Sequence, residues 1–239
     1  MAGRWTRAMS YIAMGAALAV LLAGPLTRSG ILGWKAGLAL FALASLAAGA
    51  AALWCLVGLV RGQRARIILL GAVAGSAGFA AFAAVLLHAR EVPPIHDIST
   101  DTANPPKFTA ITPEIRGSGS NSLEYDPANA PLQAAAYPMI QPVLLPMPVA
   151  NAYRKVLDAV QAQGLDIVAA VPAEGRIEAT DTARWWGFKD DVVIRIVADG
   201  QMSRVDIRSV SRVGRSDIGA NAHRISAVVA RLGRAARRL

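Results

Sequence analysis

Three long apolar runs near the N-terminus constrain this chain more than any other feature. They cover about residues 9–26, 33–60 and 67–87, and residues 1–90 contain eight basic residues and no acidic one. Each run reaches the roughly 20 apolar residues that a helix needs to cross the hydrocarbon core of a bilayer. Because the side chain of Lys35 can extend to the interface, the second span is expected over Leu38–Val60. The sequence therefore predicts three transmembrane helices and a lipid bilayer as the first partner.

The basic residues that flank these runs predict an orientation. Five would lie on the side of the N-terminus and three on the other side: Arg4, Arg7, Arg61, Arg64 and Arg66, against Arg28, Lys35 and Arg90. Short loops rich in Arg and Lys favour the cytoplasmic side. The chain has 21 Arg and 4 Lys, with frequent Ala, which is typical of a GC-rich bacterial genome. We expect a multi-pass protein of the bacterial inner membrane, with a cytoplasmic N-terminus and a periplasmic C-terminal domain.

Charge and motifs exclude several classes of function. Residues 91–239 hold 17 basic and 16 acidic residues, so the net charge of +9 belongs to the apolar part and indicates membrane flanks rather than nucleic acid. The only cysteine, Cys55, lies in an apolar run, so no intrachain disulfide is expected. No P-loop, dinucleotide-binding or nucleophile-elbow motif occurs, and we expect no cofactor and no catalytic residues.

Proline separates the apolar runs from a folded domain. Eleven of the 13 prolines fall between Pro93 and Pro148, so residues 91–147 suit neither a regular helix nor a central strand. We expect this segment to wrap along the domain of residues 148–239. Six elements are expected there: a helix over 149–160, strands over 165–171, 176–182, 192–197 and 203–213, and a final helix from about Ile218 to the end. This order predicts an α+β two-layer fold, with a four-stranded antiparallel sheet and helices on one face.

The strand expected over residues 203–213 and the turn after it carry the densest cluster of charge. Arg208, Arg212 and Arg215 would lie near the N-terminus of the final helix, whose free N–H groups favour an anion. Asp217 is expected to cap that helix. The full predicted ligand set is Arg195, Asp206, Arg208, Arg212, Arg215, Ser216, Asp217 and Asn221. The alternative is a solvated sheet face with cross-strand ion pairs.

A second candidate is a metal site. Its residues would be His96, Asp97, Asp101, Asp190 and Asp191, provided that the wrapping segment crosses the end of the sheet. These donors suit a hard or borderline divalent ion. The chain lacks a His-Glu-x-x-His motif, a His pair and a Cys ligand, and carboxylates are also common in turns.

Four stretches carry a family resemblance. They are HDISTDTANPPKF (96–108), the Tyr137-Pro138 step, WWGFKDDVVIRI (185–196) and VDIRSVSRVGRSDIGANAHRI (205–225). Over about residues 91–232 the chain resembles domain of unknown function 1499, a bacterial and chloroplast family. Several of its members are similar in carrying N-terminal membrane spans. The resemblance implies no reaction, substrate or cofactor.

These observations favour a non-catalytic membrane protein. Its outer domain would bind an anionic envelope component, such as a lipid headgroup, or a partner protein. One alternative is a metal-dependent hydrolase that uses His96, Asp97 and Asp101. Another is a structural subunit of a membrane assembly, in which Gly33-x-x-x-Gly37 and Gly71-x-x-x-Gly75 would bring helices close together.

Overall fold

A computed structural model describes residues 2–236. The chain divides into two compact units. The first unit contains the residues up to Glu91 together with Arg184–Gly187. The second unit contains Val92–Ala183 and the residues from Phe188 onward. Each unit is described here by itself.

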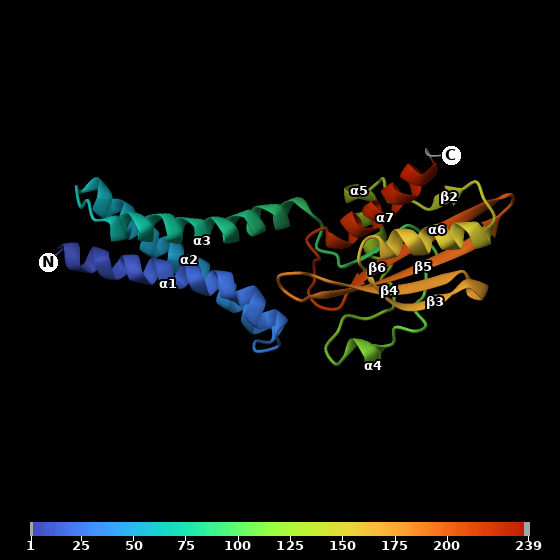
Figure 1. Cartoon of the computed structure of the whole chain (residues 1–239), viewed down its shortest axis with the longest axis horizontal. Coiled ribbons are helices and arrows are strands. Elements are labelled where there is room, and N and C mark those ends of the chain that lie inside the picture. The colour runs from blue at the N-terminus through green and yellow to red at the C-terminus, as the bar shows by residue number, and fades with distance from the viewer. Residues whose placement is uncertain (1, 237–239) are drawn as a thin grey trace. The chain divides into compact units, whose positions relative to one another are not determined.

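Three long helices make up most of the first unit (Figure 1). They are α1 (Ala2–Arg28), α2 (Trp34–Val60) and α3 (Arg66–Glu91), and each is long and apolar enough to cross a membrane. Only 28–39% of the residues in their most apolar windows are buried within the protein. Most of the apolar surface therefore faces outward, which suits helices surrounded by lipid. The three predicted spans are confirmed as helices that are long and apolar enough to cross a membrane.

Small residues let α3 approach the other two helices closely. A Cβ atom on Gly71 would come within 2.6 Å of Cα of Ser10 in α1, and one on Gly75 within 2.5 Å of the Ala48 carbonyl oxygen in α2. Close backbone approach of this kind is what small residues provide in membrane helices. In the first motif, a Cβ atom on Gly33 would meet no described atom within 4 Å, whereas one on Gly37 would clash with the side chain of Thr27 in α1. Both glycine motifs therefore pack helices within the chain.

A six-stranded antiparallel sheet organises the second unit. The strand order is β1 (Asp97–Ser99), β6 (Met202–Ser211), β5 (Lys189–Asp199), β4 (Arg176–Thr182) and β3 (Asp166–Val171), and β2 (Val143–Leu145) also pairs with β6. The prediction of four strands was wrong because β1 and β2 come from the proline-rich segment. Each has three residues, too few to show an alternating pattern in the sequence.

Helices α6 (Val149–Gln161) and α7 (Ala220–Ala236) cover one face of the sheet, as predicted (Figure 1). The core between them and the sheet includes Val156 of α6, Ile225 of α7 and Ile194 of β5, all almost fully buried. Three short helices complete the unit: α4 (Pro113–Arg116), α5 (Asn129–Ala136) and the 3-10 turn η1 (Pro172–Glu174). Figure 1 shows α4 on the side of the sheet away from α6.

The final helix begins later than predicted. Ile218 has a φ of 51° and Gly219 a φ of 79°, so both adopt a left-handed conformation, and α7 starts at Ala220. This conformation is strained for a β-branched residue. The carboxylate of Asp217 accepts hydrogen bonds from the N–H groups of Gly219 and Asn221, both at 2.8 Å. Asp217 therefore caps this end of α7. The predicted continuation to residue 239 lies outside the described residues.

Candidate ligand-binding pocket in the C-terminal domain

The sheet face opposite α6 and α7 is a buried polar layer. Side chains alternate along β6, so Asp206, Arg208 and Arg212 share this face. Asp206 is fully buried and Arg208 is 2% exposed. Cross-strand ion pairs exist, such as the one between Arg195 and Asp206, at 2.8 Å. Most of this face is nevertheless covered, because the chain before α5 folds over it, and the side chains of Arg195 and Arg204 keep 27% and 35% exposure.

Arg208 shows how this covering segment is held. Its Nε and Nη2 atoms donate to the two carboxylate oxygens of Asp97 at 2.9 and 2.7 Å. Its guanidinium also donates to the carbonyl oxygens of Pro106 and Leu123, at 3.2 and 2.8 Å. Burial raises the pKa of Asp97, although the bonds from Arg208 oppose this effect. Arg208 binds the chain's own segment, and its donors are committed there.

Two aromatic rings complete the environment of Arg208. The ring centroids of Phe108 and Tyr125 lie 5.7 and 5.5 Å from its guanidinium carbon, within the range of a cation–π contact. Burial, followed by the negative charge of Asp97, raises the pKa of Tyr125 to about 12. Both rings belong to the covering segment, so they add to its attachment.

Asp191 forms ion pairs with two further arginines, Arg116 and Arg212. Its Oδ2 accepts hydrogen bonds from Nε of Arg116 and Nε of Arg212, both at 2.9 Å. Its Oδ1 accepts from Arg212 Nη2 at 2.8 Å and from the Thr180 hydroxyl at 2.7 Å. The side chain of Arg116 is 1% exposed and that of Asp191 is fully buried. Arg212, predicted to bind an external anion, therefore shares an internal carboxylate with Arg116.

Arg195 is committed in the same way. It donates to Asp206 at 2.8 and 3.1 Å and to Asp101 at 3.0 Å. Arg204 contacts the same two carboxylates, at 3.0 and 2.8 Å. Arg195 is thus not left to bind a ligand, and Asp101 is not left to bind a metal.

Glu178 occupies an internal anion site. Its fully buried carboxylate accepts hydrogen bonds from three successive backbone N–H groups, those of Thr109, Ala110 and Ile111, at 2.7–3.1 Å. Successive N–H groups that converge in this way bind anions. Arg176 forms an additional ion pair with it. Here the anion is part of the protein.

A polar cluster also lies beneath the start of α7. Arg224 pairs with Asp181 at 2.8 Å and with Asp190 at 2.6 Å. The amide of Asn221 donates to the backbone carbonyl of His96 at 2.9 Å. Asn221, one of the predicted ligand residues, therefore positions the backbone of another candidate residue.

The five predicted metal ligands do not converge. The four carboxylates each pair with arginine, as described above for Asp97, Asp101, Asp190 and Asp191. Within residues 2–236, no group of three or more His, Cys, Asp or Glu side chains is arranged to hold a metal ion. Because an ion pair uses the oxygen atoms that a metal would need, the predicted metal centre is not assembled.

A polar pocket of about 360 Å³ lies beside His96. It is lined by Pro94, His96, Asp97, Asn121, Ser122, Glu124, Asp126, Asn129, Gly214 and Arg215. The sequence predicted three of these as site residues, but it missed the polar residues between Asn121 and Asn129. The one available signal was the polar composition that follows Gly117-Ser118-Gly119-Ser120, a stretch interpreted as a flexible interruption.

The pocket combines basic and acidic groups. The side chains of His96 and Arg215 form no hydrogen bond or ion pair with any residue in the described range. The Glu124 carboxylate, which also lines the pocket, has no such bond to a described residue, and Asp126 accepts one from the N–H of Ala128 at 2.9 Å. An anionic group of a ligand would suit His96 and Arg215, and hydroxyl or amino groups would suit Glu124 and Asp126.

A family model described as "Protein of unknown function (DUF1499)" matches residues 97–232, more than half of the chain. The chain belongs to the DUF1499 family. The match begins at Asp97, the partner of Arg208, and confirms the resemblance carried by the four stretches. It covers most of the pocket and none of the three long helices. The curated proteins contain no significant match to this chain.

Asp217 of the DUF1499 domain provides a test of pH dependence. Burial raises the pKa of its carboxyl, although the bonds from Asn221 and Gly219 oppose this effect. The folded state therefore binds the proton of this carboxyl more tightly than the unfolded state does. Ionisation of Asp217 lowers the free energy of unfolding, and protonation raises it again. As the pH falls from 7 through the raised pKa toward 3.8, wild type should gain stability relative to Asp217→Asn. Thermal unfolding of the two full-length proteins across this range measures the difference.

Asp217→Ala is the matched variant for this test. It removes the cap and should be less stable than Asp217→Asn by about 1 kcal/mol at every pH in this range, because asparagine retains an acceptor. A difference between wild type and Asp217→Asn that stays constant, or that moves in the opposite direction, would contradict the assigned pKa shift.

Proposed function

We propose that this DUF1499 protein is a non-catalytic, membrane-anchored binding protein whose C-terminal domain holds a small phosphate-bearing ligand in the polar pocket. One observation carries the proposal: His96 and Arg215 line this pocket, and neither side chain makes a hydrogen bond or ion pair with a described residue. Arg195, Arg208 and Arg212, by contrast, are all paired with carboxylates. A guanidinium group binds phosphate through parallel, charge-assisted hydrogen bonds.

The backbone around the pocket is well supported. Asn121 donates through its side chain to the carbonyl oxygens of Ser211 and Gly214, at 3.0 and 2.9 Å. The carbonyl of His96 accepts bonds from the Ser211 N–H and the Asn221 amide, both at 2.9 Å. Fixed positions of this kind reduce the entropy lost when a ligand binds. The strained conformation of Ile218, in the same loop as Arg215, is also typical of binding sites.

The acidic groups narrow the ligand class. Glu124 and Asp126 would accept hydrogen bonds from hydroxyl or amino groups beside the phosphate. Glycerol phosphate and phosphoethanolamine have this chemistry, either as free molecules or as lipid headgroups. An anionic envelope component of this type also fits the proposed topology, in which the C-terminal domain of a bacterial inner-membrane protein lies in the periplasm. The basic loop of Arg61, Arg64 and Arg66 supports that orientation.

The test is calorimetric titration of the full-length protein in mild detergent with glycerol 3-phosphate and with phosphoethanolamine. Wild type should bind at least one of them, and His96→Ala and Arg215→Ala should each weaken binding about tenfold or more, because the first removes a hydrogen-bonding imidazole and the second a charge-assisted contact. Arg154→Ala is the matched control, since Arg154 is an exposed arginine of α6 outside the pocket. It should bind as wild type does.

Wild-type binding by the Arg215→Ala/His96→Ala double variant would overturn this proposal, as would an equal loss in Arg154→Ala. Native mass spectrometry of gently extracted protein then identifies the source of the ligand. A retained phospholipid that is lost in the double variant would indicate a headgroup, whereas retention of a small phosphate compound would indicate a free metabolite.

A further inference from the structure

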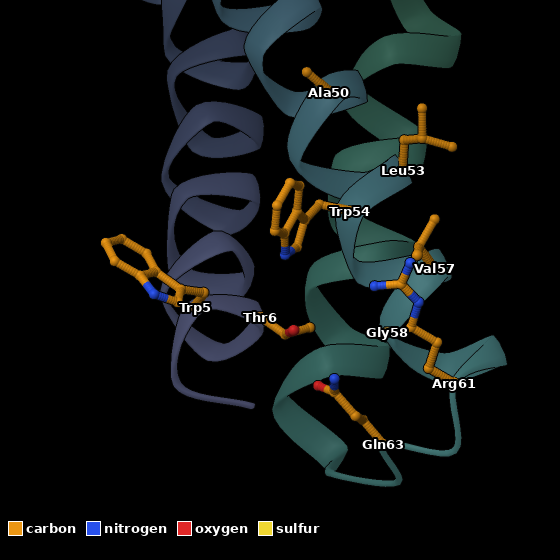
Figure 2. Close-up of a pocket in the computed structure, with 9 residues that line it drawn as sticks. All are labelled: Trp5, Thr6, Ala50, Leu53, Trp54, Val57, Gly58, Arg61 and Gln63. Atoms are coloured by element: carbon orange, nitrogen blue, oxygen red, sulfur yellow. The ribbon is translucent and has the colours of Figure 1, made fainter. Parts of the chain in front are cut away.

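A second pocket lies in the helical unit and does not depend on the proposed function of the C-terminal domain. It has a volume of about 390 Å³ and is lined by Trp5, Thr6, Ala50, Leu53, Trp54, Val57, Gly58, Arg61 and Gln63. Figure 2 shows Trp5 on α1 and Trp54 on α2, with Gln63 in the loop after α2. The pocket therefore lies at the end of the spans that carries the basic loop.

One wall of this pocket is apolar and open to the surroundings. The side chains of Leu53 and Trp54 are 63% and 54% exposed on a helix long enough to cross a membrane. At Gly58 the helices come close together, since a Cβ atom there would lie 2.6 Å from Cγ2 of Thr6. An apolar chain can thus lie along α2 over Leu53 and Trp54, beside the contact between Gly58 and Thr6.

The other end of the pocket is polar and positively charged. Arg61 directly follows α2, is exposed, and makes no ion pair with a described residue. The amide oxygen of Gln63 is buried and has no hydrogen-bond partner among the described residues. A buried acceptor without a donor is energetically unfavourable, so a donor from a bound molecule would stabilise it. No acidic residue occurs in residues 1–90 to neutralise Arg61.

We propose that this pocket binds one anionic phospholipid. Its acyl chain would lie along Ala50, Leu53 and Trp54, and its phosphate would contact Arg61. A hydroxyl of the headgroup would donate to the amide oxygen of Gln63. Phosphatidylglycerol has this combination of negative charge and hydroxyl donors. Tryptophan rings favour the membrane interface, and basic residues at the ends of spans attract anionic lipid, so both ends of the pocket match the same molecule.

Native mass spectrometry tests this directly on the full-length protein in micelles containing equal amounts of phosphatidylglycerol and phosphatidylcholine. Wild type should preferentially retain phosphatidylglycerol, and Arg61→Gln should reduce that retention about tenfold or more. Arg64→Gln is the matched control, because Arg64 belongs to the same loop but does not line the pocket. It should retain phosphatidylglycerol as wild type does.

A second pair of variants tests the apolar wall. Ala50→Phe places a ring in the pocket and should lower retention of phosphatidylglycerol, whereas Ala47→Phe adds the same ring to an exposed position of α2 outside the pocket. Equal retention of both lipids by wild type would overturn the proposal. So would equal losses in Arg61→Gln and Arg64→Gln. The His96→Ala/Arg215→Ala variant should keep its phosphatidylglycerol, which separates this site from the one in the C-terminal domain.

Discussion

Replacing Asp191 with alanine is expected to lower the free energy of unfolding of the C-terminal domain by about 3–5 kcal/mol, near the upper end of that range. Asp191 pairs with both Arg116 and Arg212, and its removal leaves the buried guanidinium of Arg116 without a carboxylate. It also removes the acceptor of the Thr180 hydroxyl. Because domains are stable by only about 5–15 kcal/mol, this loss is a large part of the total.

The measurement is a urea titration of the full-length protein in mild detergent, read by pulse proteolysis of the C-terminal domain. Asp199→Ala is the control, since Asp199 is an exposed carboxylate of the same strand, and its effect should stay within about 0.5 kcal/mol. If Asp191→Ala yields no folded protein, Asp191→Asn keeps one acceptor of similar shape and should show a smaller loss. A change in Asp191→Ala no larger than in Asp199→Ala would show that the buried layer is not held by this carboxylate.

Replacing Arg208 with methionine is expected to cost about 3–5 kcal/mol for the same physical reason. It leaves Asp97 buried without its counterion and frees the carbonyl oxygens of Pro106 and Leu123. The covering segment should then detach before the rest of the domain unfolds. Hydrogen exchange of the full-length protein should show lost protection at the N–H groups of Thr109, Ala110 and Ile111.

The double variant Asp97→Asn/Arg208→Met separates charge from packing. Because the uncompensated carboxylate is gone, the double variant should be more stable than Arg208→Met alone by about 1–3 kcal/mol. The two residues touch, so their effects should not add. Additive losses would mean that the ion pair itself carries little of the stabilisation.

These expectations explain what the family stretches do in this chain. Within 96–108, Asp97 binds Arg208, Asp101 binds two arginines, and Phe108 lies against the Arg208 guanidinium. Within 205–225, Asn221 supports the backbone of His96. Asp97, Asp101 and Phe108 of these stretches therefore attach the covering segment to the sheet. Ligand recognition, as proposed, depends on the pocket residues that this attachment brings together.

The parts of the fold with a strong local period were predictable. The three spans could be identified because an apolar run of about 20 residues has few other stable arrangements. Helices α6 and α7 and strands β3 to β6 follow from periods of 3.6 and 2 residues, and the cap at Asp217 follows from local helix chemistry. The helices cover one face, as the order of elements had indicated.

The pairing of charges could not be predicted in the same way. Local pattern placed Arg208 and Arg212 on one face of β6, but whether that face met solvent, a ligand or the chain itself depended on residues about 100 positions away in the sequence. Free arginines and internally neutralised ones have the same sequence signature. The predicted anion and metal sites were therefore taken from residues whose charges are largely cancelled inside the domain.

The amino-acid sequence by itself determined the three long apolar helices, the antiparallel strands β3 to β6 with the helices α6 and α7, and the family, because these depend on short-range periodicity and recognisable stretches. Only the tertiary structure decided which charged groups remain available. The covering segment buries Asp97 with Arg208 and leaves His96 and Arg215 in a pocket. The reason is physical: a charge may be buried only with its partner, and partners distant in sequence meet only when the chain folds.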